Sequence, residues 1–130
     1  MKIFSNYLQL IFKFSNICLI ILYLYPGSLI GFLLYNDFSN QPQITRDFFD
    51  ISSNHIYAFC LISFIGLFAF ESKKRLFIYL FFLSIILEFL HLFIPNRSFQ
   101  MGDLNGNLLG VIIPFLTYKI YEFLFQSKKQ

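Results

Sequence analysis

The sequence has few charged residues, few cysteines and no tryptophan. Only 13% of its 130 residues are charged, whereas soluble domains carry about 25%. The two cysteines, Cys18 and Cys60, fall in separate apolar runs, so the sequence predicts neither a disulfide framework nor a Cys-x-x-Cys metal pair. We interpret both as small apolar side chains. The net charge of +3 is too low to indicate a nucleic-acid-binding protein.

Apolar residues dominate what is present. Hydrophobic residues make up 57% of the chain, and phenylalanine alone supplies 20 residues. Such a composition is typical of membrane proteins, and a chain of this length has room for four spanning helices of about 20 residues each. No internal repeat, heptad pattern or Gly-Ser linker divides the chain. We therefore predict a single all-α membrane domain over residues 1–130, an integral membrane four-helix bundle.

The apolar runs predict four spans, at about residues 10–27, 55–71, 76–94 and 104–125. Two polar segments, 36–54 and 95–103, are predicted to be loops on the same side of the membrane. Pro26-Gly27 interrupts the end of the first span. Residues 28–35 then either continue the helix beyond a kink or lie in the membrane interface.

Basic residues are distributed unevenly between the two sides of the predicted bundle. Only Arg46 and Arg97 fall on the side of the two polar loops. Because short loops rich in Lys and Arg stay in the cytoplasm, we expect both termini to be cytoplasmic and the polar loops to face outward. This predicts a multi-pass protein of the cell membrane, which is the inner membrane if the host is Gram-negative. The remaining basic residues lie on the opposite side: Lys2, Lys13, Lys73, Lys74, Arg75, Lys119, Lys128 and Lys129.

A cluster of polar residues lies where the third predicted span ends and the fourth begins. Glu88 and His91 are three residues apart, so they share one helix face. Asp103 and Asn107 are four residues apart and share a face of the next helix, where Asp103 is suited to cap the first turn. Polar side chains in hydrocarbon are costly unless they are paired or hydrated. The cluster is therefore a candidate functional site.

The third and fourth predicted spans are joined by a short loop, so we expect them to be antiparallel neighbours. Gly106 and Gly110 lie one turn apart on the fourth span. Because glycine has no side chain, this pair would allow the backbones of two helices to approach closely. We therefore predict a helix-packing role for both glycines.

Arg97 lies in that short loop, and its role has two interpretations. In the first, its guanidinium pairs with Glu88 and Asp103 while Asn107 bridges the two helices, so that the residues only hold the hairpin together. In the second, the acids orient Arg97 at a water-facing mouth. There the planar guanidinium can bind a phosphate or a carboxylate through two hydrogen bonds.

The order and spacing of these residues resemble the VanZ-like family of small bacterial membrane proteins. His91 stands where the family usually has Gln, and Pro114 where a further Gly is common. His55 matches the His of a second family element, Asp-Lys-x-x-His, although the Lys is absent and Asp50 is one place too early. The similarity covers residues 14–125, including a Tyr-Pro-Gly-Ser-Leu exit from the first span. The residues at the family's spacing are Glu88, Pro95, Arg97, Asp103, Asn107 and Gly110.

The resemblance implies a topology and a cellular context. It implies a membrane-spanning domain with the polar site on the outer face, in the cell envelope. The family takes its name from a protein that lowers susceptibility to the glycopeptide antibiotic teicoplanin, so an effect on glycopeptide susceptibility is one expectation for this chain. The resemblance implies no particular reaction.

The first of three functional hypotheses is a non-enzymatic envelope protein whose outward site binds an anionic or glycan-lipid headgroup. In this hypothesis Arg97 holds the anion, and neither a catalytic residue nor a cofactor or metal is assigned. Its partners are membrane lipids, with a lipid-linked glycan as one candidate. The residues expected around Arg97 are Glu88, His91, Asp103, Asn107 and, from the second span, His55.

The other two hypotheses belong to different classes. One is an intramembrane enzyme or metal site that uses His55, Glu88, His91 and Asp103, because Glu-x-x-His on one helix can supply two metal ligands. A di-metal bundle site needs two such motifs, and the sequence has one. The third hypothesis is a structural or assembly partner in a membrane complex, with other membrane proteins or further copies of the chain. Four helices alone are too few to enclose a transport path.

Overall fold

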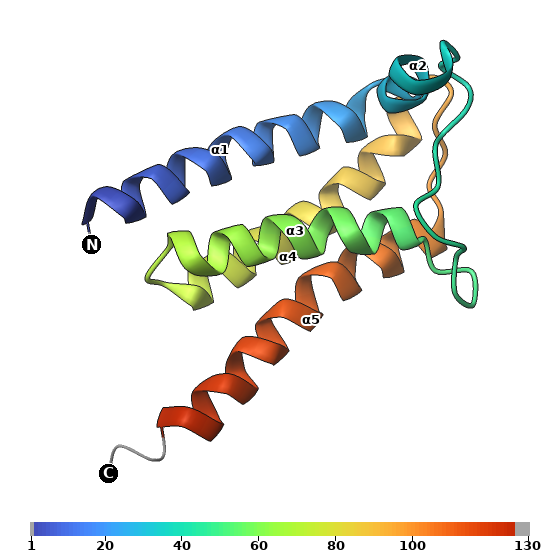
Figure 1. The fold of residues 1–130 in the computed structure, drawn as a ribbon. Helices are drawn as coiled ribbons and strands as arrows, with labels where there is room; N and C mark the ends of the chain where they lie inside the picture. The colour runs from blue at the N-terminus through green and yellow to red at the C-terminus, as the bar shows by residue number, and fades with distance from the viewer. Residues whose placement is uncertain (1, 127–130) are drawn as a thin grey trace.

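Within residues 2–126, which the computed structural model describes, the chain folds into five α-helices and one 3₁₀ turn (Figure 1). The all-α prediction is confirmed. Two of the predicted cytoplasmic cations, Lys128 and Lys129, and the side chain of Lys2 lie outside the described residues. The elements are α1 (Lys2–Leu24), α2 (Leu29–Tyr35), α3 (Ser53–Ala69), α4 (Lys73–Leu90), η1 (His91–Phe93) and α5 (Met101–Gln126).

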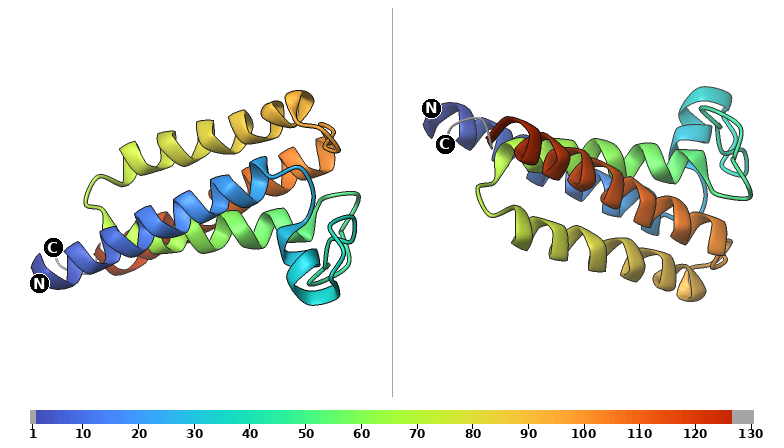
Figure 2. Two further views of the ribbon diagram at one scale, coloured as in Figure 1. Left: turned by 90° about the horizontal axis from the view of Figure 1, so that it is seen from above. Right: turned by 90° about the horizontal axis from the view of Figure 1, so that it is seen from below.

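The four long helices run lengthwise between two ends of the molecule (Figure 2). The start of α1, the end of α5 and the turn between α3 and α4 lie at one end, which we call the terminal end. α2 and the segments 36–52 and 94–100 lie at the other, which we call the loop end. α5 makes its most extensive contacts with α3, α3 also packs against α1, and α4 packs mainly against α5.

Three of the helices are long and apolar enough to cross a membrane, over Ser5–Leu24, Lys73–Phe93 and Met101–Phe125. α3 is a shorter apolar helix of 17 residues. At 1.5 Å per residue it extends over about 25 Å, close to the thickness of a hydrocarbon core. The chain is therefore a multi-pass membrane protein, and three of the four predicted spans have full spanning length.

Two helix starts differ from the prediction. α1 begins at Lys2, ahead of the predicted span, so Lys13 lies about midway along the helix rather than near its start. α5 begins at Met101, because the Gln100 carbonyl accepts the first α-helical hydrogen bond, from the N–H of Leu104 at 3.0 Å. Asp103 therefore lies inside the first turn and does not cap the helix, which corrects the predicted capping role. Its carboxylate still lies near the positive end of the helix dipole.

Residues 28–35, for which the sequence left two alternatives open, contain a separate helix, α2. Gly27 ends the connection from α1 with a φ of 137°, a conformation that side-chain-bearing residues rarely adopt. Ser28 caps α2 by accepting a hydrogen bond from the N–H of Gly31 at 2.9 Å. Asn36 ends it in the left-handed region, with a φ of 55°. α2 is thus a seven-residue helix at the loop end and does not extend α1.

The 36–52 segment is fastened to the start of α3 by side-chain hydrogen bonds. Asp47 Oδ1 accepts from the N–H of Ser53 at 2.8 Å, and Ser53 Oγ donates to the Thr45 carbonyl at 2.6 Å. Asn54 Nδ2 donates to the Pro42 carbonyl at 2.8 Å. The N–H of Ser53 holds the pKa of the exposed Asp47 carboxyl below its usual range. These contacts hold the long polar segment against the helix that carries His55.

The two glycines of α5 face α3 rather than the sequence neighbour α4. A Cβ at Gly106 would lie 2.6 Å from the carbonyl oxygen of Ser52. At Gly110 it would lie 2.6 Å from Phe59 Cβ and 2.7 Å from the Ile56 carbonyl oxygen. Only glycine fits so close a backbone approach. The short loop makes α4 and α5 sequence neighbours, but it does not determine which face of α5 each helix contacts.

Candidate functional site

Buried polar side chains from all four long helices and η1 meet at the loop end. Tyr23 lies in the last turn of α1, His55 in the first turn of α3, and Asn107 in the second turn of α5. Glu88 lies in the last turn of α4, and His91 follows in η1. Glu88 and Asn107 are fully buried. Because buried polar groups are costly without partners, their hydrogen bonds determine what the cluster can do.

Asn107 is at the centre of the hydrogen bonding. Its Nδ2 donates to the Ser84 carbonyl at 3.3 Å, which leaves Oδ1 as the acceptor. Oδ1 accepts from the Tyr23 hydroxyl at 2.6 Å and faces His55 Nδ1 at 3.0 Å. Asn107 therefore joins α5 to α1, α3 and α4, a wider connection than the two-helix bridge that the sequence predicted.

Glu88 and His91 share a face, as their spacing indicated. His91 Nδ1 lies 3.4 Å from Glu88 Oε1, and His91 Nε2 donates to the Tyr23 carbonyl at 3.0 Å. Glu88 Oε1 also accepts from the N–H of Gln100 at 2.9 Å. The second oxygen, Oε2, is buried and has no hydrogen-bond partner in the described part of the chain.

Three possible metal ligands from different helices also converge here. His55 Nε2 lies 3.7 Å from Asp103 Oδ2. One ligand atom from each of His55, Glu88 and Asp103 lies within 4.8 Å of the other two. Imidazole nitrogen and carboxylate oxygen are common ligands of divalent transition-metal ions.

Arg97 contacts the end of α1 rather than the acids of the cluster. Among the described residues neither Glu88 nor Asp103 forms an ion pair with it, so the first of the two interpretations, in which Arg97 pairs with these acids, is wrong. The physical reason is that the last carbonyls of a helix lack partners within the helix and carry partial negative charge. The acceptors of the guanidinium are the carbonyls of Gly27 (2.7 Å), Tyr25 (3.2 Å) and Leu22 (3.4 Å), and Gln41 Oε1 (3.5 Å).

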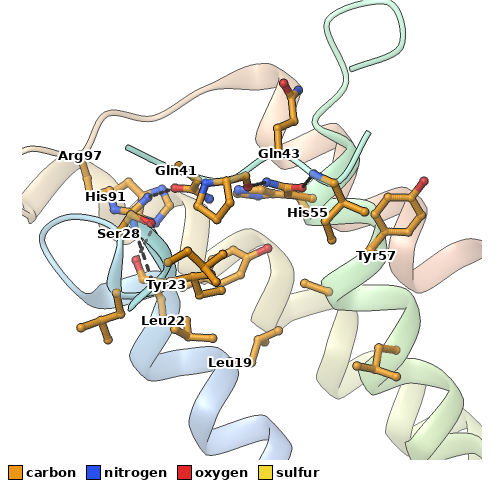
Figure 3. A pocket seen from close by; sticks show the side chains of 18 residues that line it. Leu19, Leu22, Tyr23, Ser28, Gln41, Gln43, His55, Tyr57, His91 and Arg97 are labelled. Carbon is orange, nitrogen blue, oxygen red and sulfur yellow. Dashed lines mark hydrogen bonds between the residues drawn. The ribbon is translucent and has the colours of Figure 1, made fainter. Parts of the chain in front are cut away.

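A pocket of about 400 Å³ lies beside the cluster (Figure 3). His55, His91 and Arg97 line it together with polar residues of the 36–52 segment, Gln41 and Gln43. Another part of its wall is formed by apolar side chains. The apolar lining comes largely from Leu19, Leu22, Leu29, Ile30, Leu34, Ala58 and Leu61.

A second pocket of about 470 Å³ is adjacent to the first. The two share Ser28, Gln41 and Arg97 in their linings. The rest of the second pocket is formed by the 26–27 turn and by Phe38, Ser39 and Asn96. Arg97 therefore lines both cavities at the loop end.

Tyr23 belongs to the cluster, although the sequence pattern did not single it out. Its hydroxyl bonds to Asn107, and its ring centroid lies 5.0 Å from that of His55 and 6.0 Å from that of His91. The available signal was a hydroxyl inside an apolar run, which needs a partner when it is buried. Tyrosine is also common at membrane interfaces, so only the packing of the helices distinguishes a buried tyrosine from an interfacial one.

The helices that build the cluster also match a known family. The family model described as VanZ/LLP1 matches residues 3–124. The chain belongs to the VanZ/LLP1 family. This confirms the resemblance found in the sequence, and the matched region contains every residue of the cluster. No curated protein and no solved structure matches the chain.

Membership of the VanZ/LLP1 family and the long apolar helices together identify a membrane protein with transmembrane helices. VanZ is linked to glycopeptide resistance. The family name assigns no ligand. What the site can bind therefore has to be argued from its own residues.

Proposed function

We propose that this VanZ/LLP1 protein is a cell-envelope membrane protein whose loop-end pocket binds the anionic or glycan-bearing headgroup of a membrane lipid. The observation that carries the proposal is the position of Arg97. Its guanidinium has no carboxylate partner among the described residues, and it lines a pocket that also has an apolar wall. A lipid offers the matching combination of an anion and hydrocarbon. The proposal concerns binding and assigns no catalysis.

The positive charge of Arg97 is not neutralised, because its partners are carbonyl and amide oxygens. A planar guanidinium binds phosphate or carboxylate through two parallel hydrogen bonds. The contact with Gln41, at 3.5 Å, is the longest of the four and involves a side chain. It is therefore the contact that a phosphate oxygen would replace at the lowest cost.

The apolar part of the pocket supports a lipid rather than a free anion. Leu19 and Leu22 of α1 and Ala58 and Leu61 of α3 belong to two neighbouring membrane helices. An acyl or prenyl chain along these side chains would bury apolar surface, at about 25 cal/mol per Å². Headgroup and chain would then be recognised by different walls of one pocket.

The loop end is proposed to face outward. The basic residues 73–75 lie at the start of α4 and Lys119 lies towards the end of α5, both at the terminal end, whereas the loop end has Arg46 and Arg97. The excess of basic residues favours a cytoplasmic terminal end. The lipid would then lie in the outer leaflet, which agrees with the glycopeptide link of VanZ.

Binding of fluorescent phosphatidylglycerol to the full chain in detergent micelles tests the proposal. A phosphatidylcholine analogue provides the zwitterionic comparison, and a polyprenyl-pyrophosphate disaccharide provides the glycan-bearing one. Arg97→Ala should weaken binding of an anionic probe about tenfold or more, because a charge-assisted contact is lost. Arg97→Lys should give an intermediate affinity, because lysine keeps the charge without the planar fork.

The matched control is Arg46→Ala, which removes the other loop-end arginine from an exposed position and should leave affinity unchanged. Thermal unfolding in the same detergent separates loss of binding from loss of the contacts that Arg97 makes with α1. If both Arg97 variants bind all three lipids as tightly as the wild type, the proposal is wrong. In cells, a deletion and Arg97→Ala should change teicoplanin susceptibility in the same direction.

A further inference from the structure

We infer that His55, Glu88 and Asp103 form a binding site for one divalent transition-metal ion, with Zn²⁺ and Mn²⁺ as the ions to test. The residues come from α3, α4 and α5, and one ligand atom of each lies within 4.8 Å of the other two. Of the three, only His55 also lines the pocket with Arg97. The inference therefore goes beyond lipid binding and does not depend on it.

The hydrogen bond of His55 leaves one ring nitrogen free for a metal. Asn107 Oδ1 can only accept, since Nδ2 of the same amide donates to the Ser84 carbonyl. His55 Nδ1 therefore carries the hydrogen in their 3.0 Å contact, and Nε2 of the neutral ring keeps its lone pair. Nε2 is the atom that faces Asp103. Histidines that bind metals are commonly held through the other nitrogen in this way.

Glu88 supplies a buried oxygen that has no partner. Its side chain is fully buried, and Oε1 already accepts from Gln100 and faces His91. Oε2 is buried without a hydrogen-bond partner among the described residues. A carboxylate oxygen left in this state in the interior of a membrane protein is costly unless a cation or a hydrogen-bond donor lies beside it. A metal ion at Oε2 supplies the missing partner.

The local charges favour a divalent ion. Within residues 2–126, no lysine or arginine forms an ion pair with Glu88 or Asp103. Arg97 is held at the end of α1, and the nearest cationic candidates are therefore the two histidines. Two carboxylates so close together repel when both are ionised. A divalent ion between the two carboxylates relieves this repulsion.

The separation of the ligand atoms is compatible with a transition-metal site that has three protein ligands. With bonds of about 2.1 Å, a tetrahedral Zn²⁺ site has ligand atoms about 3.4 Å apart. The Nε2–Oδ2 separation of 3.7 Å is close to this value, so small side-chain movements complete the site. Three protein ligands leave a further position for water or another ligand.

His91 is not part of the site, which narrows the ligand set that the sequence allowed. Its Nε2 donates to the Tyr23 carbonyl at 3.0 Å. Its Nδ1 faces Glu88 Oε1, so we assign the other oxygen, Oε2, to the metal. His91 therefore orients Glu88 and leaves Oε2 for the ion.

The test is metal binding by the full chain, purified in a mild detergent and treated with a chelator. Isothermal titration with ZnCl₂ and MnCl₂ gives the affinity, and elemental analysis after gel filtration gives the stoichiometry. We expect one ion per chain. Glu88→Gln and Asp103→Asn keep the side-chain shapes and should each weaken binding about 100-fold. Asn107→Ala, which removes the group that orients His55, should weaken it about 10–100-fold.

The matched control is Glu122→Gln, an acid of α5 that pairs with Lys119 at the terminal end and should leave metal affinity unchanged. Should the buried variants not fold, Co²⁺ added to the wild-type protein provides a second measurement, because a four-coordinate protein site gives visible absorption bands much stronger than those of aqueous Co²⁺. A wild-type protein with well below one ion per chain and without these bands overturns the inference, as do substituted proteins with wild-type affinity. Arg97→Ala should bind the metal normally, so loss of lipid binding and loss of metal binding are distinguishable.

Discussion

The two ends of the molecule bury polar groups in different ways. At the terminal end, polar side chains bond to the last carbonyls of α3. Gln9 Nε2 donates to the Ala69 carbonyl at 3.3 Å, and Lys73 Nζ donates to those of Leu67 and Phe70. The neighbouring interior is filled by apolar side chains, among them Phe12, Leu67, Ala69 and Leu76.

At the loop end the interior itself is polar. Tyr23 and His55 each bond to Asn107, and Glu88 lies fully buried beside them. With the bond from Asn107 to the Ser84 carbonyl, these contacts connect four helices. The terminal-end contacts instead join Gln9 of α1 and Lys73 of α4 to the end of α3. The loop-end contacts also leave an oxygen of Glu88 without a partner in the described part of the chain. Buried polar atoms without partners are found more often at functional sites than elsewhere, so this difference between the two ends supports the proposed binding role of the loop end.

The largest expected difference between the two ends concerns their glycines. Gly110→Ala should destabilise the protein by about 1–3 kcal/mol, because its Cβ would lie 2.7 Å from a backbone carbonyl that cannot turn away. The matched change at the terminal end is Gly66→Ala. Its Cβ would meet side-chain atoms of Leu76 and Phe12 at 2.8–2.9 Å, which can shift more readily than a backbone carbonyl, so the loss of stability should be smaller. Unfolding by SDS in mixed micelles measures the stability of both variants, and equal losses of stability would contradict the expected difference between the two ends.

A smaller effect is expected from removing one hydroxyl at each end. Tyr23→Phe should destabilise by about 0.5–1.5 kcal/mol, because it removes a buried hydrogen bond to Asn107. Tyr118→Phe removes a bond to Glu122 at a less buried position of the terminal end and should have little effect. The same SDS titration measures the pair. A larger loss for Tyr118→Phe would show that the polar cluster is not the more tightly coupled region.

The smallest effect concerns pH and the segment that covers the loop end. The pKa of the Asp47 carboxyl is lowered in the folded protein. The ionised carboxylate therefore stabilises the fold at pH values above the ordinary carboxyl pKa, about 3.9, and this stabilisation is lost as pH falls through the lower folded value. Because the side chain is exposed, the contribution should be only a few tenths of a kcal/mol. Asp47→Asn should remove this part of the acid dependence, and Asp50→Asn should retain it. Stability curves between neutral and acidic pH check this, and identical curves for Asp47→Asn and wild type would exclude the contact.

Much of the candidate site was predictable because it depends on spacing along a helix. Glu88 and His91 share a face, and Asp103 and Asn107 share another, as any α-helix requires. The partners of Arg97 were not predictable. Opposite charges at 88, 97 and 103 favoured an ion-pair interpretation, but the free carbonyls of α1 lie closer to the guanidinium in space. Tyr23 was missed for the same reason, since its partner is 84 residues away in the chain.

By itself the sequence determined the helical class, the apolar segments, the shared faces of the polar residues and the resemblance to the VanZ/LLP1 family. The match of the family model to residues 3–124 confirms that resemblance. These are properties of composition and of local periodicity. Only the tertiary structure decided that the α5 glycines face α3, that α2 is a separate helix, and that His55, Glu88 and Asp103 converge. The physical reason is that a period of 3.6 residues determines which side chains lie on one face of a helix, whereas the packing of all the helices determines which faces meet.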